Sequence, residues 1–178
     1  MCMVRNNKSG GGSTTTEHGN KFENDTDLLK ILEKNGYEVR DGTVFFKQNV
    51  VGSVALHSDF YHVILHTTQD EVSKLFGFSL IPDTAFFNKK NQTLYIIEKK
   101  YQESSGSVDE KLQTCEFKLR FYNKAVWEFN NEEIKHVRFF YIFNDYYSKP
   151  KYDEVRRFIQ DKGCDYYFDT IELSAIGL

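Results

Sequence analysis

PDTAFFNKKNQTLYIIEKK, residues 82–100, is the stretch that decides the fold of this chain. Two runs rich in apolar, aromatic and β-branched residues, 84–87 and 93–100, flank the polar segment 88–92. Such runs around a polar turn are typical of two strands that pair as an antiparallel hairpin. The stretch therefore predicts a hairpin whose open end brings Asp83 close to the end of the second strand.

The second strand of this hairpin carries charged residues on a defined face. Because side chains alternate between the two faces of a strand, Glu98 and Lys100 point to one face and Lys99 points to the other. Asp83 opens the partner strand 15 positions before Glu98 (98 minus 83), so the turn brings its carboxylate close to them. The hairpin therefore predicts a cluster of two carboxylates and one ammonium group.

This cluster has the chemistry of a metal-dependent hydrolase. Carboxylate oxygens are hard ligands that suit Mg²⁺, which keeps several waters and also binds phosphate. A neighbouring lysine can orient or deprotonate a water molecule. The alternative is a surface salt bridge, but the charges follow the apolar run Leu-Tyr-Ile-Ile, and buried charges are rarely retained without a function. We therefore expect hydrolysis of phosphodiester bonds at Asp83, Glu98 and Lys100.

The chain before the hairpin predicts an arm, a helix and further strands. Residues 1–19 are rich in Gly, Ser, Thr and Asn, which predicts a flexible N-terminal arm. A helical apolar stripe starts after Asn20 and stops at Asn35-Gly36, a strong C-terminal signal. Turn signals and alternation predict the remaining elements: strands in 37–48 and 50–66, and a short helix in 70–76.

The chain after the hairpin predicts a long helix, a buried strand, and a closing helix and strand. Ser107 begins a Ser-x-x-Glu capping box, and the helical pattern that it opens ends near Glu128. The almost continuous apolar run 137–143 is typical of a strand buried on both faces. A helix over 152–162 and a strand over 166–173 follow. Together these elements predict an α/β fold, with a mixed central sheet flanked by helices.

Size and composition bound the class of protein. The chain has 178 residues, of which 40% are hydrophobic, enough for one substantial core and short for two domains. Its three cysteines show neither a disulfide framework nor a zinc-binding spacing. No stretch reaches the roughly 18 apolar residues of a membrane span, and the first residues lack the apolar run of a signal peptide. We expect a cytoplasmic protein without a membrane partner, with residues 20–178 as a single domain.

The charge of the chain is unevenly distributed. A net charge of −3 argues at first against a nucleic-acid partner, because phosphate binding favours a basic surface. The average hides a basic stretch in the centre of the chain, whose members are Lys89, Lys90, Lys99, Lys100, Lys111, Lys118, Arg120 and Lys124. This basic stretch is either a face that binds DNA or a set of ordinary solvated side chains.

The motif on the hairpin resembles that of a known family. Pro82-Asp83, a spacer, and then Glu98-Lys99-Lys100 after an apolar run is similar to the signature of the PD-(D/E)XK nuclease superfamily. The expected order of elements over residues 20 to 145 is similar to that family's helix, three strands, helix and strand. The resemblance implies a restriction-endonuclease-like fold.

The same resemblance implies roles for individual residues. Asp83 and Glu98 would be ligands of Mg²⁺, and Lys100 would assist the attacking water. A backbone carbonyl, of Ile97 or of Lys99, would supplement the metal coordination.

Further candidates lie on either side of the motif. Members of the superfamily often carry another acidic residue on the first helix, facing the metal. Glu23 matches that position and Glu17 is the competing candidate, although a carboxylate at a helix start can also interact with the helix macrodipole. Five side chains are candidates for DNA contacts: Gln102, Lys111, Gln113, Lys89 and Lys90. The alternative is that they are ordinary solvated surface residues.

Resemblance and size together predict a function. We expect an Mg²⁺-dependent DNA endonuclease, specifically a type II restriction endonuclease that acts as a homodimer on a short double-stranded sequence. One alternative is a structure-specific nuclease, such as a Holliday-junction resolvase or a DNA repair endonuclease. Another is a DNA-binding module of the same fold without catalysis, against which the intact Asp83, Glu98 and Lys100 argue.

Overall fold

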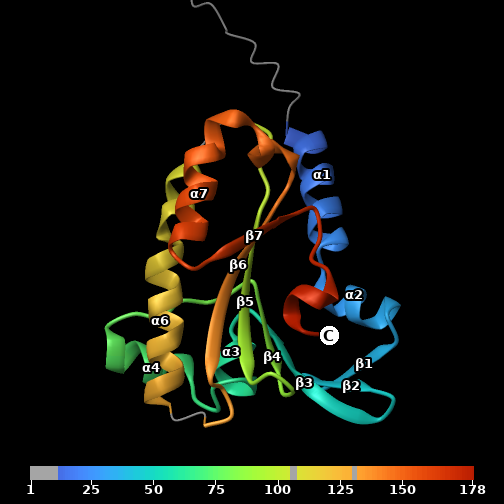
Figure 1. The fold of residues 1–178 in the computed structure, drawn as a ribbon, viewed down its shortest axis with the longest axis vertical. Coiled ribbons are helices and arrows are strands. Elements are labelled where there is room, and N and C mark those ends of the chain that lie inside the picture. The colour runs from blue at the N-terminus through green and yellow to red at the C-terminus, as the bar shows by residue number, and fades with distance from the viewer. Residues whose placement is uncertain (1–11, 105–107, 130–131) are drawn as a thin grey trace, which may run out of the picture.

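The computed structural model describes residues 12–104, 108–129 and 132–178, and seven strands of that part of the chain form one mixed sheet (Figure 1). The strands are β1 (Tyr37–Arg40), β2 (Thr43–Phe46), β3 (Asn49–Leu56), β4 (Thr84–Asn88), β5 (Thr93–Lys100), β6 (His136–Phe143) and β7 (Asp165–Phe168). They are hydrogen-bonded in chain order from β1 to β7. Strands β1 to β5 pair antiparallel, whereas β6 pairs parallel with both β5 and β7.

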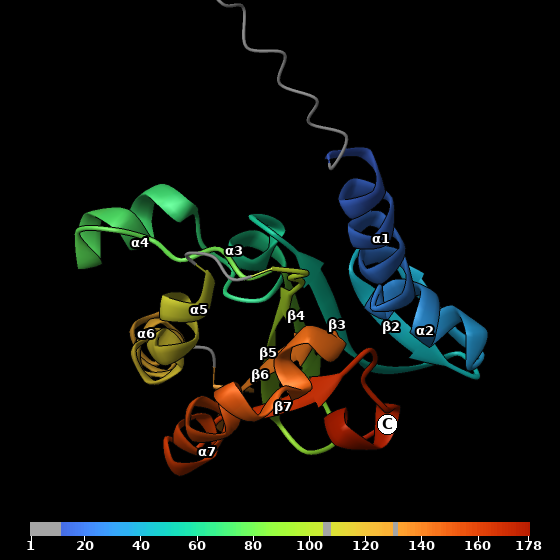
Figure 2. The same ribbon diagram turned by 90° about the horizontal axis from the view of Figure 1, so that it is seen from above.

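Helices cover both faces of this sheet. They are α1 (Gly12–Asp25), α2 (Leu28–Lys34), α3 (Asp59–Val63), α4 (Gln69–Phe76), α5 (Val108–Lys111), α6 (Cys115–Glu128) and α7 (Asp153–Asp161). Figure 2 shows α1 and α2 on one side of the sheet and α6 and α7 on the other, and two separate hydrophobic cores fill these interfaces. The predicted fold class, an α/β mixed sheet flanked by helices, is confirmed. Within the described residues, no helix is both long and apolar enough to cross a membrane.

The hairpin predicted at residues 82–100 is confirmed as β4 and β5. The two strands pair antiparallel, with Thr84 opposite Ile97. The side chain of Asn88 closes the turn, because its Oδ1 accepts a hydrogen bond from the backbone N–H of Lys90 at 2.9 Å. The open end of the hairpin therefore carries the motif, and the turn lies at the opposite end of the strands.

Side chains of β5 alternate between the two cores, as predicted. Ile96 packs in the core that contains Tyr122 of α6, and Ile97 packs in the core that contains Leu32 of α2. This alternation directs Glu98 to the same side of the sheet as α6.

The first helix begins earlier than predicted. α1 starts at Gly12, inside the segment 1–19 that composition assigned to a flexible arm, and residues 1–11 lie outside the described residues. On this helix, Nδ1 of His18 contacts Oε1 of Glu103 at 2.8 Å. A contact with a residue so distant in the sequence is not visible in local composition, so the sequence did not indicate the earlier start of the helix.

The single helix predicted between Asn20 and Asn35 is divided into α1 and α2. Thr26 Oγ1 donates to the carbonyl oxygen of Phe22 at 2.7 Å, and the side chain of Asp27 caps α2. Short polar side chains that bond to the nearby backbone favour helix ends over helix interiors. The predicted apolar stripe is present on α1 and α2, but the break between the two helices was not predicted.

The segment 50–66, predicted as strands, is a strand in its first part and a helix in its second. β3 ends at Leu56, and α3 follows. The buried side chains of the second part recur at helical spacing: Phe60, Tyr61, Ile64 and Leu65. The strand prediction was wrong there because a short apolar run suits either element.

The long helix after the motif is confirmed in its main part as α6, which ends at Glu128 as predicted. Ser107, which opens the predicted capping box, lies outside the described residues. A 3₁₀ turn at Leu112–Thr114 separates α5 from α6, and Thr114 Oγ1 donates to the carbonyl oxygen of Lys111 at 2.7 Å. The regular pattern of the sequence did not reveal this interruption.

The last elements follow the prediction except at the end of the final strand. The buried strand and the following helix are confirmed as β6 and α7. β7 ends at Phe168 rather than at Leu173, because Asp169 adopts a φ of 57°, which interrupts an extended strand.

Helix α4 offers a test of local stability. Thr68 caps it through a reciprocal capping box, in which its Oγ1 accepts from the backbone N–H of Glu71 at 3.2 Å. Replacing Thr68 by alanine is expected to lower the free energy of unfolding by about 1 kcal/mol. Urea denaturation would measure the change, with Ser73→Ala within the same helix as the control that leaves the cap intact. Equal stability of the wild type and Thr68→Ala would contradict the capping role.

Candidate active site

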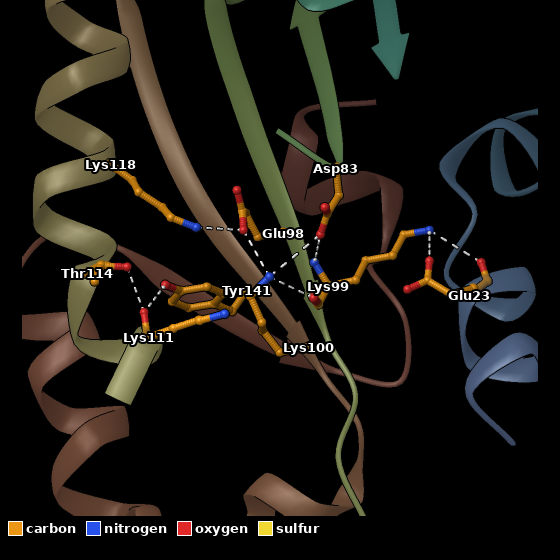
Figure 3. A network of polar contacts seen from close by, with 9 residues as sticks. All are labelled: Glu23, Asp83, Glu98, Lys99, Lys100, Lys111, Thr114, Lys118 and Tyr141. Atoms are coloured by element: carbon orange, nitrogen blue, oxygen red, sulfur yellow. Dashed lines mark hydrogen bonds and ion pairs between the residues drawn. The ribbon is translucent and has the colours of Figure 1, made fainter. Parts of the chain in front are cut away.

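The open end of the hairpin gathers the three predicted residues of the motif (Figure 3). The Lys100 ammonium lies 2.9 Å from Oε2 of Glu98 and 3.7 Å from Oδ2 of Asp83. The same ammonium donates to the carbonyl oxygen of Lys99 at 2.9 Å. Asp83 is fixed in turn, because its Oδ2 accepts the backbone N–H of Lys99 at 2.7 Å. The backbone of β5 therefore positions the first carboxylate of the motif against the second.

Glu98 is the most enclosed charge of this group. The residue is only 5% exposed, and removing a carboxylate from water costs several kcal/mol unless charged partners compensate. It has two such partners, because its Oε2 also lies 2.7 Å from the ammonium of Lys118 on α6. The buried charge is thus compensated from its own strand and from the neighbouring helix.

Lys118 had been recognised only as a member of the basic stretch. The signal that could have singled it out is its spacing: it lies three residues after Cys115 and four before Tyr122. Both of those residues are buried against the sheet, so Lys118 is on the sheet-facing stripe of α6. A lysine in an otherwise apolar stripe indicates a buried acidic partner.

Two buried tyrosines, Tyr122 and Tyr141, lie near the carboxylates, and both are uncharged. Burial, with a further contribution from the charge of Glu98, raises the pKa of Tyr122 far above its ordinary value. Burial likewise raises the pKa of Tyr141, whose ring centroid lies 5.9 Å from the Lys100 ammonium. Both phenols therefore keep their protons at neutral pH and add no negative charge beside the two carboxylates.

The oxygens around Lys100 fit a divalent cation. Asp83 Oδ2, Glu98 Oε2 and the Lys99 carbonyl oxygen all face one positive charge, the ammonium itself. They are hard oxygen donors from β5 and from the residue that precedes β4, the kind that Mg²⁺ takes together with waters. No group of three or more His, Cys, Asp or Glu side chains that could hold a metal occurs among the described residues. A metal here would thus need the carbonyl and water besides the two carboxylates.

Of the two carbonyls predicted as further ligands, that of Lys99 faces this position. Ile97 lies two residues earlier in β5, within the sheet and opposite Thr84.

Glu23 lies on the other side of β5 from Glu98. Its Oε2 contacts the ammonium of Lys99 at 3.1 Å, and Figure 3 shows Lys99 reaching from the motif toward α1. Glu23, Lys99 and Asp83 line one pocket of about 510 Å³. The structure thus connects Glu23 to the motif through Lys99 and does not bring it onto the Glu98 face, while the competing Glu17 is exposed on α1.

Two of the predicted DNA contacts lie beside the motif. The backbone of Gln102 is held by Asn144, which donates to its carbonyl oxygen at 2.8 Å. The carbonyl oxygen of Lys111 accepts a hydrogen bond from Tyr141 Oη at 3.3 Å, which places the end of α5 next to Tyr141. Gln113 is exposed on the 3₁₀ turn that follows α5.

The last two of the five predicted DNA contacts, Lys89 and Lys90, are not brought to the site. Lys89 and Lys90 occupy the β4–β5 turn, at the far end of the strands from Asp83. The linear basic stretch could not show this separation, because the hairpin places its first two members at the opposite end of the strands from Lys99 and Lys100.

Comparison with protein families agrees with this geometry. A model of the PD-(D/E)XK nuclease superfamily domain matches residues 14–120, more than half of the chain. The matched segment runs from α1 into α6 and includes Asp83, Glu98 and Lys100. Comparisons with curated proteins and with solved structures found no significant match. On the evidence of this match, the chain belongs to the PD-(D/E)XK nuclease superfamily.

Proposed function

We propose that the protein is an Mg²⁺-dependent DNA endonuclease, and specifically a type II restriction endonuclease that cuts a short double-stranded sequence. The observation that carries the proposal is the convergence of Asp83 Oδ2, Glu98 Oε2 and the Lys99 carbonyl oxygen on a single cation, the Lys100 ammonium. These groups stand at the open end of a hairpin in a chain of the nuclease superfamily.

Each residue of the site has its own role in phosphodiester hydrolysis. Asp83, Glu98 and the Lys99 carbonyl would hold Mg²⁺, which supplies Lewis-acid activation of a phosphoryl oxygen and of a bound water. Lys100 would orient the attacking water and, in its amine form, accept the proton that this water loses. The backbone N–H of Lys99 keeps Asp83 in place, and the centroid of the Tyr141 ring lies 5.9 Å from the Lys100 ammonium.

The restriction subtype is proposed from the motif and the compact α/β fold. Restriction of a palindromic sequence would call for two copies of the chain, because the two-fold symmetry of the site is matched by a two-fold dimer. Cytoplasmic action is part of the same proposal. The free, buried thiols of Cys115 and Cys164 fit a reducing compartment.

A panel of nucleic acids tests the proposal. Purified protein is incubated with Mg²⁺ and supercoiled plasmid, linear duplex, a four-way junction or single-stranded DNA. The restriction proposal expects discrete fragments from the linear duplex. Cutting confined to the four-way junction would replace it by a structure-specific nuclease such as a resolvase. Binding of DNA without cleavage of any substrate would replace it by a non-catalytic module.

A further inference from the structure

The Glu98 carboxylate is shared between two lysines that reach it from different elements. Oε2 lies 2.9 Å from the ammonium of Lys100 on β5 and 2.7 Å from that of Lys118 on α6. Side-chain exposures of 6% for Glu98 and 19% for Lys118 show that this second contact is largely withdrawn from water. Removing one partner of a pair that is withdrawn from water leaves an uncompensated charge, so loss of this contact is costly.

The two lysines differ in their other contacts. Besides Glu98, the Lys100 ammonium contacts the Lys99 carbonyl oxygen and Asp83 Oδ2, the oxygens proposed to hold the metal. A metal ion and an ammonium repel each other and compete for the same oxygens. Metal binding therefore requires the Lys100 ammonium to move off Glu98.

Lys118 approaches Glu98 from the helix side. Its ammonium lies 5.8 Å from the centroid of the Phe139 ring, and Figure 3 shows it meeting the carboxylate on the side away from Asp83. Both ammonium groups lie on the same oxygen, Oε2, so Lys118 keeps that oxygen paired when Lys100 leaves it. The other carboxylate oxygen, Oε1, can then face the metal.

We propose that Lys118 is a positioning residue that keeps Glu98 paired and oriented as a metal ligand once Lys100 has moved away. This inference rests on the proposed function. Without Lys118, the buried carboxylate has Lys100 as its charged partner, the group that metal binding moves away. Once Lys100 has moved, the carboxylate is no longer held in the orientation of a metal ligand, and ordering it again costs binding free energy.

Replacing Lys118 by methionine is expected to raise the Mg²⁺ concentration for half-saturation by about 10-fold or more, the scale found for partners that support a metal ligand. Two measurements should agree: calorimetric binding of Mg²⁺ to the protein without DNA, and the Mg²⁺ dependence of DNA cleavage. Lys118→Arg keeps the positive charge and the hydrogen bond, and should restore half-saturation to within about 3-fold of the wild type.

A matched control is the lysine–glutamate pair between α7 and α6. Lys162 contacts Oε2 of Glu116 at 3.0 Å, outside the site and with a lysine exposure of 37%. Lys162→Met should leave Mg²⁺ half-saturation unchanged. If Lys118→Met does not fold, Lys118→Gln removes the charge while keeping a hydrogen-bond donor, and the same shift is expected of it.

The outcomes separate this inference from the proposed function. Wild-type protein that binds Mg²⁺ and cleaves DNA, together with a Lys118→Met variant that has the same half-saturation, would assign Lys118 to packing and overturn the inference. Wild-type protein that neither binds Mg²⁺ nor cleaves any DNA would instead contradict the proposed function.

Discussion

Replacing Lys100 by alanine is expected to lower the single-turnover rate of DNA cleavage by about 100-fold to 10,000-fold, the contribution typical of a positioned acid–base group. The lysine is the side chain that contacts both carboxylates, and the neighbouring tyrosines keep their protons because burial raises their pKa values. The affinity for DNA, measured by fluorescence anisotropy, should change little. The substitution removes only one positive charge, and the other contacts with DNA remain.

The Lys100→Ala variant should still fold. Glu98 keeps its contact with Lys118 at 2.7 Å, so the substitution does not leave the buried carboxylate without a charged partner. Lys34→Ala, an exposed lysine at the end of α2, is the matched control and should cleave at the wild-type rate. Cleavage by Lys100→Ala at the wild-type rate would remove Lys100 from the mechanism.

Comparison with the Lys118 variant gives each lysine a distinct signature. Loss of Lys100 should reduce the rate even at saturating Mg²⁺, whereas loss of Lys118 should chiefly raise the Mg²⁺ concentration that the reaction requires. The difference follows from their contacts, because Lys100 faces the metal-binding oxygens and Lys118 supports one of them.

Replacing Gly52 by alanine is expected to produce the largest loss of stability. A Cβ atom at this position in β3 would lie 2.0 Å from the carbonyl oxygen of Phe87 in β4. The obstacle is backbone, so β3 and β4 would have to separate where Gly52 is opposite Asn88. Overpacking of this kind costs about 3 kcal/mol, which for a protein of this size lowers the melting temperature by about 6 to 12 °C.

Thermal unfolding followed by circular dichroism measures the effect. Gly19→Ala in α1 is the matched control, because its Cβ would meet Tyr101 at an ordinary contact distance of 3.7 Å. That variant should be as stable as the wild type or up to about 1 kcal/mol more stable, since alanine is the better helix former. A melting temperature of Gly52→Ala equal to that of the wild type would contradict the close strand packing described here.

The sequence predicted the central hairpin and its faces because a strand repeats every two residues. The positions of Ile96 and Ile97 in opposite cores follow from that period, and so does the shared face of Glu98 and Lys100. The buried strand β6 was predicted for a related reason, since a continuous apolar run of its length suits a strand covered on both faces.

Features that depend on contacts between distant segments were not predicted. One such feature is the start of α1 at Gly12, since His18 on this helix contacts Glu103 far along the chain. The break at Thr26 and the helical second part of 50–66 have local causes, but there the sequence pattern suits more than one structure. The same limit applies to the site. The pairing of Glu23 with Lys99 and of Lys118 with Glu98 joins helices to β5 across long stretches of chain.

The proposed function places hydrolysis of DNA with a divalent metal at the open end of the β4–β5 hairpin. It is tested by the rate of duplex DNA cleavage by the wild-type protein in Mg²⁺, followed on a gel, beside the same reaction with excess chelator. Cleavage is expected to require Mg²⁺ and to stop when the metal is removed. Cleavage that continues unchanged in the chelator, or no cleavage at any Mg²⁺ concentration, would contradict it.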